Sequence, residues 1–365
     1  MKKIADSKKS TAISLAKRRH QLSLRRKDAV YDQTKRIQKT NSVFGIPIIE
    51  APNMLCIYVD DGDIDRFEST IEFLRRIKAL NSGEKYYLSF KNTKLIEAAA
   101  ILLIYSAIEE AIKENDCSLH YIPPDAPHAR KLLKSKNIPK LLSNSKIEYF
   151  LSKYENLPII SGQSNSYTDE VVDHIKERVF EDELDPEKES IFGSAVTETV
   201  DNVDLHAYPE PVNGSKPWWL VCSVIDKQLF LAIYDKGVGI PETIRGKQDL
   251  LARIRNSLPY FKHRGKISSE MSESQALEIL RKPGSLSDAE SVMLSMMSDV
   301  SSTHQDKHGQ GSKSIKALVD DNEQGKLWIF SNKGLLVKES AKAGNLIELP
   351  SSIDGTLIQW NIKLE

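Results

Sequence analysis

Hydrophobic residues in the first half of the chain alternate between strand-like and helix-like spacing. Short apolar runs, typical of strands, occur at 54–60, 86–90 and 117–122. Helical segments are expected between and after them, at 64–78 (where Phe67, Ile71, Leu74 and Ile77 share one face), 95–113, 129–137 and 138–142. Strands that alternate with helices predict an α/β layer domain, which we place at residues 46–150.

The second half separates its helices from its strands. Residues 146–190 are more polar, and we place a linker at 151–165 in front of a second domain at 166–365. Helices are expected at 171–180, at 189–208 and from about Ser312. Apolar runs predict strands at 218–226, 227–235, 326–331, 334–339 and 355–364. This segregation is typical of an α+β two-layer sandwich with a mostly antiparallel sheet.

The composition is that of a globular chain, with 40% hydrophobic and 28% charged residues among 365. The longest uncharged apolar stretch, 98–108, is far shorter than the roughly 18 residues of a membrane span. The basic N-terminus lacks the apolar segment of a secretory signal. Three widely spaced cysteines, Cys56, Cys117 and Cys222, form no disulfide or zinc pattern. We therefore expect a cytoplasmic protein with no membrane contact.

Charge is balanced overall but concentrated at the N-terminus. Residues 1–40 hold 13 lysines and arginines against three aspartates, a net charge of +10, and we assign 1–45 to a basic arm. Such an arm can neutralise phosphates and bind nucleic acid in a salt-dependent way. The alternative is a solvated segment that keeps the protein soluble or contacts its own acidic body.

Three short motifs in the second half carry candidate chemistry. The first is ETVDN (198–202), in which Glu198 and Asn202 lie on the same face of the expected helix. A carboxylate can orient or deprotonate a water, and an amide oxygen can bind Mg²⁺, which prefers oxygen ligands. Taken alone, this spacing also fits a solvated helix face.

The second motif, DKGVGIP (235–241), follows an apolar strand directly. Asp235 provides a fixed acceptor suited to the amine of adenine, and Gly237 and Gly239 let the backbone approach a ligand closely. The third motif, KHGQGSKS (307–314), precedes a helix, where glycines expose backbone N–H groups that favour phosphate. Its spacing matches neither the P-loop nor the dinucleotide-binding fingerprint. Alone, either motif fits an ordinary turn or loop.

In this order the motifs resemble those of the GHKL superfamily, which includes type II topoisomerases, heat-shock chaperones, mismatch-repair ATPases and histidine kinases. ETVDN resembles the N box, and DKGVGIP and HGQGSKS resemble the two glycine boxes. Gly355-Thr356 resembles the Gly-Thr of a late strand. The resemblance covers about 165–365 and implies a Bergerat-type ATP-binding fold.

The resemblance implies a role for each matched residue. Glu198 would be the general base, Asn202 a Mg²⁺ ligand, and Asp235 the adenine acceptor, with Thr356 nearby through water. Gly237 and Gly239 would admit base and ribose. The phosphates would be held by Gly309, Gly311 and Ser312, with charge from Lys307 and Lys313. ATP and Mg²⁺ are the expected cofactors.

Residues 242–307 would form a long ATP lid, or else an insertion that docks a partner. Topoisomerase and mismatch-repair relatives complete their site with a lysine from a following domain. In this sequence, which ends at Glu365, Lys307, Lys313 or a partner protein would have to replace that lysine, and otherwise we expect slow hydrolysis.

The first domain resembles the STAS fold of anti-anti-sigma factors and transporter tails in its order of strands and helices. Where that family carries a phosphorylatable serine, this chain has IEAAA (96–100), which lacks a hydroxyl. A phosphoserine switch at that position is therefore not expected. A generic βαβ scaffold is the alternative interpretation.

Three functions remain open from the sequence. The leading hypothesis is a slow Mg²⁺-dependent ATPase that acts as a dimerisation or partner switch in bacterial signalling or defence. The second is a serine protein kinase of the anti-sigma type that acts on a separate STAS partner. The third is a non-catalytic ATP-dependent interaction module, against which Glu198 argues. Expected partners are a second copy of the chain or a protein bound through the STAS-like domain.

Overall fold

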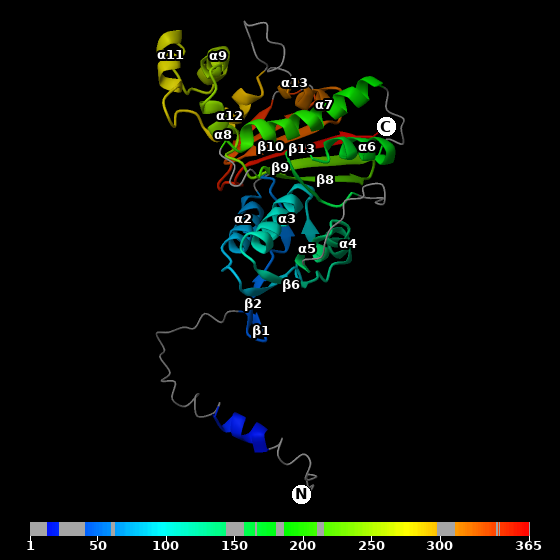
Figure 1. Ribbon diagram of the computed structural model, residues 1–365. Coiled ribbons are helices and arrows are strands. Elements are labelled where there is room, and N and C mark those ends of the chain that lie inside the picture. The colour runs from blue at the N-terminus through cyan, green and yellow to red at the C-terminus, as the bar shows by residue number, and fades with distance from the viewer. Residues whose placement is uncertain are drawn as a thin grey trace. The chain divides into compact units, whose positions relative to one another are not determined.

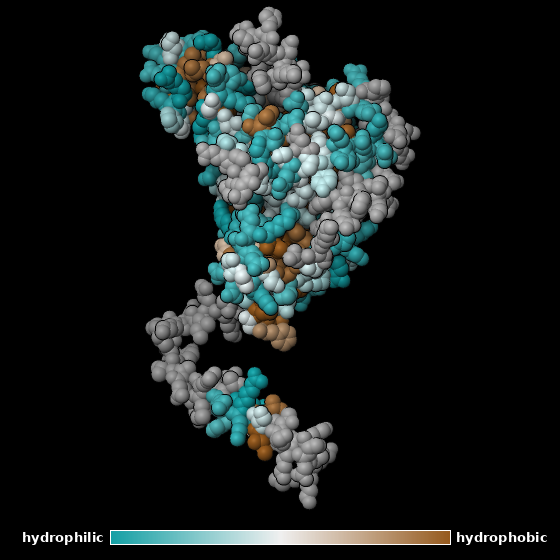
Figure 2. Space-filling model, viewed as in Figure 1, coloured by the Kyte–Doolittle hydropathy of each residue, from teal (hydrophilic) through white to brown (hydrophobic). Residues whose placement is uncertain are grey.

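A computed structural model describes residues 13–21, 41–59, 63–143, 157–164, 166–179, 186–209, 215–297, 311–340, 342 and 344–364 (Figure 1). The chain divides into two compact units, 1–42 and 43–365. In the first unit, residues 13–21 form an exposed helix that carries both hydrophobic and hydrophilic surface (Figure 2). Within the described ranges, no helix has the length and apolarity needed to cross a membrane.

The N-terminal layer of the second unit is built on three parallel strands. β2 (Ile46–Glu50) pairs with β4 (Lys85–Ser89), and β4 pairs with β6 (Ser118–Ile122). β1 (Ser42–Val43) precedes them in the chain, and β3 (Met54–Leu55) and β5 (Leu95–Ile96) form a separate parallel pair. The helices are α2 (Ile64–Lys78), α3 (Ala98–Lys113), α4 (Pro127–Ser135) and α5 (Ile138–Leu142).

The first expected strand, 54–60, is shorter in the structure than in the sequence-based expectation. Among its described residues, 54–59, only Met54 and Leu55 are in a strand, and the parallel sheet takes β2 instead. The backbone leaves the ladder at Cys56, whose N–H donates to Thr70 Oγ1 at 3.0 Å. Burial, rather than strand pairing, explains the apolar character of Cys56 and Ile57.

The second sheet has seven strands, and every neighbouring pair in it is antiparallel. Its order is β12 (Asn345–Glu348), β11 (Gly334–Glu339), β10 (Lys326–Ser331), β13 (Thr356–Lys363), β9 (Gln228–Asp235), β8 (Pro217–Ile225) and β7 (Ile160–Gln163). Asp226 and Lys227 join β8 to β9, both at positive φ, as in a tight hairpin. β7 lies within the segment expected as a linker, because Ile160 is buried in the core beside β8.

Both faces of this antiparallel sheet are buried, which explains its nearly continuous apolar strands. On β9, Leu229, Leu231 and Ile233 pack with α6 (Thr168–Val179), α7 (Pro186–Asn202) and α13 (Gly311–Asp320). Ala232 and Tyr234 point to the other face, which α3 covers (Figure 1). The molecule is thus a mixed α/β protein with a parallel-containing sheet and an antiparallel sheet.

Polar contacts also join the two layers that the sequence suggests as separate domains. Glu109 of α3 is buried, and its Oε2 accepts from Trp219 Nε1 at 2.6 Å and from Ser161 Oγ at 3.0 Å. Lys136 is buried too, and its Nζ donates to the carbonyl oxygens of Leu157 and Cys222, each at 2.8 Å. Residues 43–365 consequently fold as one compact unit.

The segment expected as a lid is largely helical in its described part, 242–297. It contains α8 (Ile240–Arg245), α9 (Leu250–Asn256), α10 (Leu258–His263), α11 (Glu273–Leu280) and α12 (Asp288–Ser295). These helices share a small core of their own that includes Ile254, Phe261 and Leu280. α12 also packs on β10, β11 and β12. Residues 298–307 lie outside the described residues.

Candidate functional site

A cavity of about 190 Å³ opens where β9 ends and β13 begins. It brings together Glu198, Asn202, Asp235, Gly239 and Thr356, which the sequence places in two distant motifs and a late strand. Asp235 and Thr356 are register partners on the two strands. The lining also includes further polar residues, among them Thr199, His206 and Thr243, and a set of apolar side chains: Val203, Leu205, Ala207, Ile233, Ile240, Ile244, Met296, Ile315 and Ile358. A ligand with an apolar body and several polar groups fits such a lining.

Asp235 is a buried carboxyl in the lining of this cavity, with 6% of its surface exposed. Its Oδ1 accepts a hydrogen bond from the Gly237 backbone N–H at 2.8 Å. Burial raises the pKa of the carboxyl to about 7, and backbone hydrogen bonds from Gly237 and Thr356 oppose this rise. The ionised form is therefore an acceptor that gains from a donor placed in the cavity.

The C-terminal end of α7 contributes Glu198 and Asn202 to the lining. Asn202 Nδ2 donates to the carbonyl oxygen of Glu198 at 2.7 Å, which leaves Oδ1 as the ligating atom of that side chain. Desolvation, followed by the nearby Asp201 charge, raises the pKa of Glu198. A carboxylate with a raised pKa is better suited to accept a proton from water.

The two glycines of the first glycine box differ in what they contact. Gly239 has a φ of +84° and lines the cavity. Gly237 lies against the π-helix η3 (Val203–Ala207) instead, where an added Cβ would stand 2.3 Å from the Ala207 carbonyl oxygen. The same carbonyl accepts from Val238 N–H at 2.8 Å. Gly237 thus permits close packing of the two segments and is not among the lining residues.

The first half of the KHGQGSKS motif, 307–310, falls on residues that the structure does not describe. Lys307 and Gly309 lie outside the described residues. Gly311 and Ser312 begin α13, one turn before the cavity-lining Ile315, and Lys313 is exposed and outside the lining. The described part of the motif therefore contributes the start of a helix beside the cavity.

Whether the cavity could bind Mg²⁺ depends on the oxygen ligands that its lining provides. Across the described ranges, no group of three or more His, Cys, Asp or Glu residues is arranged to hold a metal ion. Glu198 and Asn202 supply only two oxygen-bearing side chains. That set fits a cation that takes its remaining ligands from phosphate oxygens and water, as Mg²⁺ commonly does.

Two cationic residues of the lining were not anticipated from sequence. Lys247 is exposed at the cavity and follows α8. Arg253 is buried, and its guanidinium donates to the carbonyl oxygens of Leu294, Ser295 and Met297 and to Asp249. Arg253 thus caps α12 at its C-terminal end. Lys247 is a charged residue shortly after the DKGVGIP motif, and this position in the sequence could have indicated that it lines the cavity.

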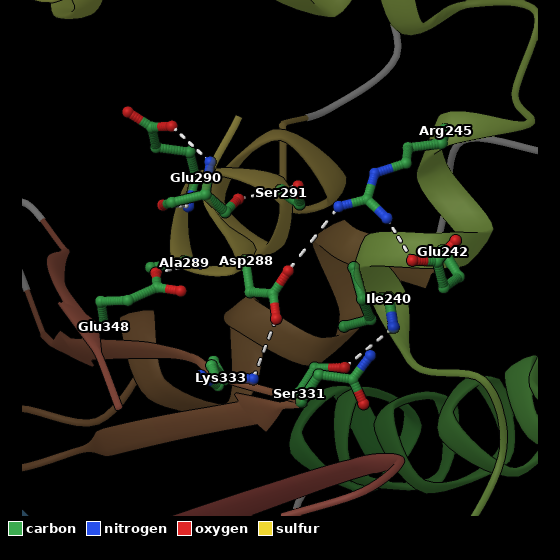
Figure 3. Close-up of polar contacts among 12 residues, drawn as sticks. Ile240, Glu242, Arg245, Asp288, Ala289, Glu290, Ser291, Ser331, Lys333 and Glu348 are labelled. Carbon is green, nitrogen blue, oxygen red and sulfur yellow. Dashed lines mark hydrogen bonds and ion pairs between the residues drawn. The ribbon is translucent and has the colours of Figure 1, made fainter. Parts of the chain in front are cut away.

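Ser331 is a further residue that sequence motifs missed, and it links the cavity to the helical segment. Its Oγ lies 3.0 Å from Thr356 Oγ1 and accepts from Ile240 N–H, the start of α8, at 2.8 Å. Figure 3 shows the neighbouring anchor, in which Asp288 of α12 accepts from Lys333 N–H at 3.1 Å and faces Arg245 at 3.8 Å. The helical segment is therefore fixed to the sheet at both α8 and α12.

Comparisons with known proteins do not assign a function, so a functional proposal has to be based on the geometry of the cavity. No protein-family model matches the chain, and no curated protein matches it.

Proposed function

We propose that residues 166–365 form an ATP-binding module of the GHKL type, with a Bergerat-type fold, and that it hydrolyses ATP slowly with Mg²⁺. The observation that carries the proposal is the single cavity shared by Glu198, Asn202, Asp235 and Thr356. These residues come from the end of a helix and the facing ends of two strands. Their order along the chain is that of the GHKL motifs.

The chemistry of the cavity supports an adenine nucleotide in particular. The apolar lining accommodates a flat base, and Asp235 accepts from its exocyclic amine. Glu198 holds the proton taken from the attacking water, which its raised pKa favours. Asn202 Oδ1 binds a cation that would neutralise the phosphate charge.

The N-terminal layer belongs to the same proposal as a STAS-like interaction module. Its parallel strands and its helices α2 and α3 support that comparison. In this protein α3 is packed on the antiparallel sheet, next to the strand that ends at Asp235. A partner that binds this layer would act on the nucleotide site through that contact. We assign the whole protein to the cytoplasm.

The test is ATP binding and Mg²⁺-dependent turnover of the full chain, the Glu198→Gln variant and a Glu189→Gln control. Glu189 lies on the same helix and pairs with Lys176, away from the cavity. Glu198→Gln should keep ATP binding and lose about 100-fold or more in turnover, whereas Glu189→Gln should keep both. Equal turnover in all three proteins would refute the catalytic role of Glu198, and absence of ATP binding would refute the proposed function.

A further inference from the structure

Four charged residues form two ion pairs that join the N-terminal layer to the segments next to Asp235 and Thr356 of the cavity lining. Lys236 Nζ pairs with Glu110 Oε2 of α3. Lys78 Nζ of α2 pairs with Asp354 Oδ2 at 2.7 Å. The two pairs lie near enough for Lys236 and Lys78 to repel and for Lys236 and Asp354 to attract. α2 and α3 themselves pack against each other.

Each pair includes a residue that is close in sequence to a polar residue of the cavity lining. Lys236 directly follows Asp235, and Asp354 precedes Thr356 by two residues. The two strand ends are also in tight contact, because an added Cβ on Gly355 would lie 2.1 Å from the Asp235 carbonyl oxygen. Tyr234 Oη donates to the Asp354 carbonyl oxygen at 2.9 Å, which ties the strands together once more.

In the pair between Lys236 and Glu110, the lysine side chain is largely shielded from water. The Lys236 side chain is 15% exposed, so desolvation lowers its pKa while Glu110 opposes that shift. An ammonium in such a place depends on its partner, because removal of the carboxylate leaves a partly buried charge. Lys236 would then move toward water and shift the backbone next to Asp235.

We propose that Glu110 and Lys78 are positioning residues for the nucleotide site, and that they hold Asp235 and Thr356 in register with the bound base. The proposal rests on the proposed function. One ion pair from each helix would connect α2 and α3 to the residues beside the cavity. The adenine end of the ligand is the part affected, since Asp235 and Thr356 line the cavity.

The experiment is a charge reversal with rescue, with adenosine and ATP affinities measured for the full chain. Glu110→Lys should lower the affinities for adenosine and ATP by roughly tenfold. The double variant Glu110→Lys, Lys236→Glu should restore most of that loss. The second ion pair should give the same pattern: Lys78→Glu should lower both affinities, and the double variant Lys78→Glu, Asp354→Lys should restore most of that loss. Glu110→Gln is the milder variant should Glu110→Lys unfold, and thermal unfolding is recorded for every protein.

The matched control is Asp320→Lys, which breaks the pair between Asp320 and Lys338 at 2.6 Å. The Lys338 side chain is 16% exposed, nearly the same as Lys236, and neither control residue lines the cavity. This variant should leave both affinities unchanged. Three results would overturn the positioning role alone. The Glu110 variants could bind both ligands as tightly as the parent, the control could lose as much affinity as they do, or both double variants could fail to restore affinity. A parent that binds no nucleotide would overturn the proposed function as well.

Discussion

Asp235 and Thr356 lie directly opposite each other on neighbouring antiparallel strands, the first at the end of β9 and the second at the start of β13. Both line the cavity, and the Asp235 carboxyl accepts from the Thr356 backbone. On the other side of β9, Asp235 is in register with Trp218. This part of the candidate site is therefore set by strand register across the centre of the antiparallel sheet.

Asp235→Asn is expected to separate ligand binding from stability. An amide keeps the shape of the carboxyl but removes the charge, so adenosine and ATP affinities should fall roughly tenfold to 100-fold, as for a hydrogen bond to a charged group. Stability at about pH 8 should not fall, because an amide has no charge to desolvate. Calorimetric titration and urea unfolding measure the two effects. A variant that binds as tightly as the parent would contradict the role of Asp235.

The stability of the fold is expected to depend on pH through the same carboxyl. Burial raises its pKa from 3.8 to about 7, so the folded protein keeps a proton that the unfolded chain has already lost. This contribution to stability is complete below about pH 4 and is lost as the pH rises to about 7. The stability difference between parent and Asp235→Asn should follow that course in urea unfolding. A difference that stays constant across this range would contradict the raised pKa.

Nucleotide affinity should depend on pH in the opposite direction. The ionised carboxylate is the better acceptor for the adenine amine, so affinity should rise as the pH passes through about 7. Binding near neutral pH should release a proton. Titration calorimetry in buffers of different ionisation enthalpy would detect that proton, and in Asp235→Asn the release should disappear.

Gly237 and Gly193 are expected to respond in opposite ways to the same added methyl group. The Cβ of Gly237→Ala would stand 2.3 Å from the Ala207 carbonyl oxygen, so the free energy of unfolding should fall by about 1–3 kcal/mol. Gly193 lies within α7 with its closest contact at 3.8 Å, and alanine there should raise stability by about 0.5–1 kcal/mol. Denaturant unfolding of both variants checks the sign. Equal stability would show that η3 moves aside at little cost.

Lys247→Ala should distinguish the phosphate end of the ligand from the base end. Lys247 is exposed at the cavity, so its loss should lower the affinity for ATP several-fold, about 1 kcal/mol, and leave the affinity for adenosine unchanged. Added salt should reduce the difference between parent and variant. Lys282→Ala, an exposed lysine of the same helical segment outside the lining, is the control. An equal loss for adenosine would place Lys247 at the base instead.

Much of the secondary structure follows from local patterns in the sequence. Helical spacing from Phe67 to Ile77 gives α2, and the apolar run before Asp235 gives β9. β2 and β7 were missed because short segments with one proline or glycine have little periodicity. In η3, the expected helix changes its hydrogen bonding where Ala207 meets the glycine box.

The sequence by itself determined which chemical groups are present: Glu198, Asn202, Asp235 and Thr356 bring carboxylate, amide and hydroxyl oxygens in short segments far apart in the chain. Only the tertiary structure decided that they share one cavity, that Ser331 and Lys247 lie beside them, and that Gly237 packs on Ala207 instead of lining it. It also decided that α3 covers the second face of the sheet, through Glu109 and Glu110. Those outcomes depend on pairing between residues distant in the chain, whose geometry and burial have no local signature in the sequence.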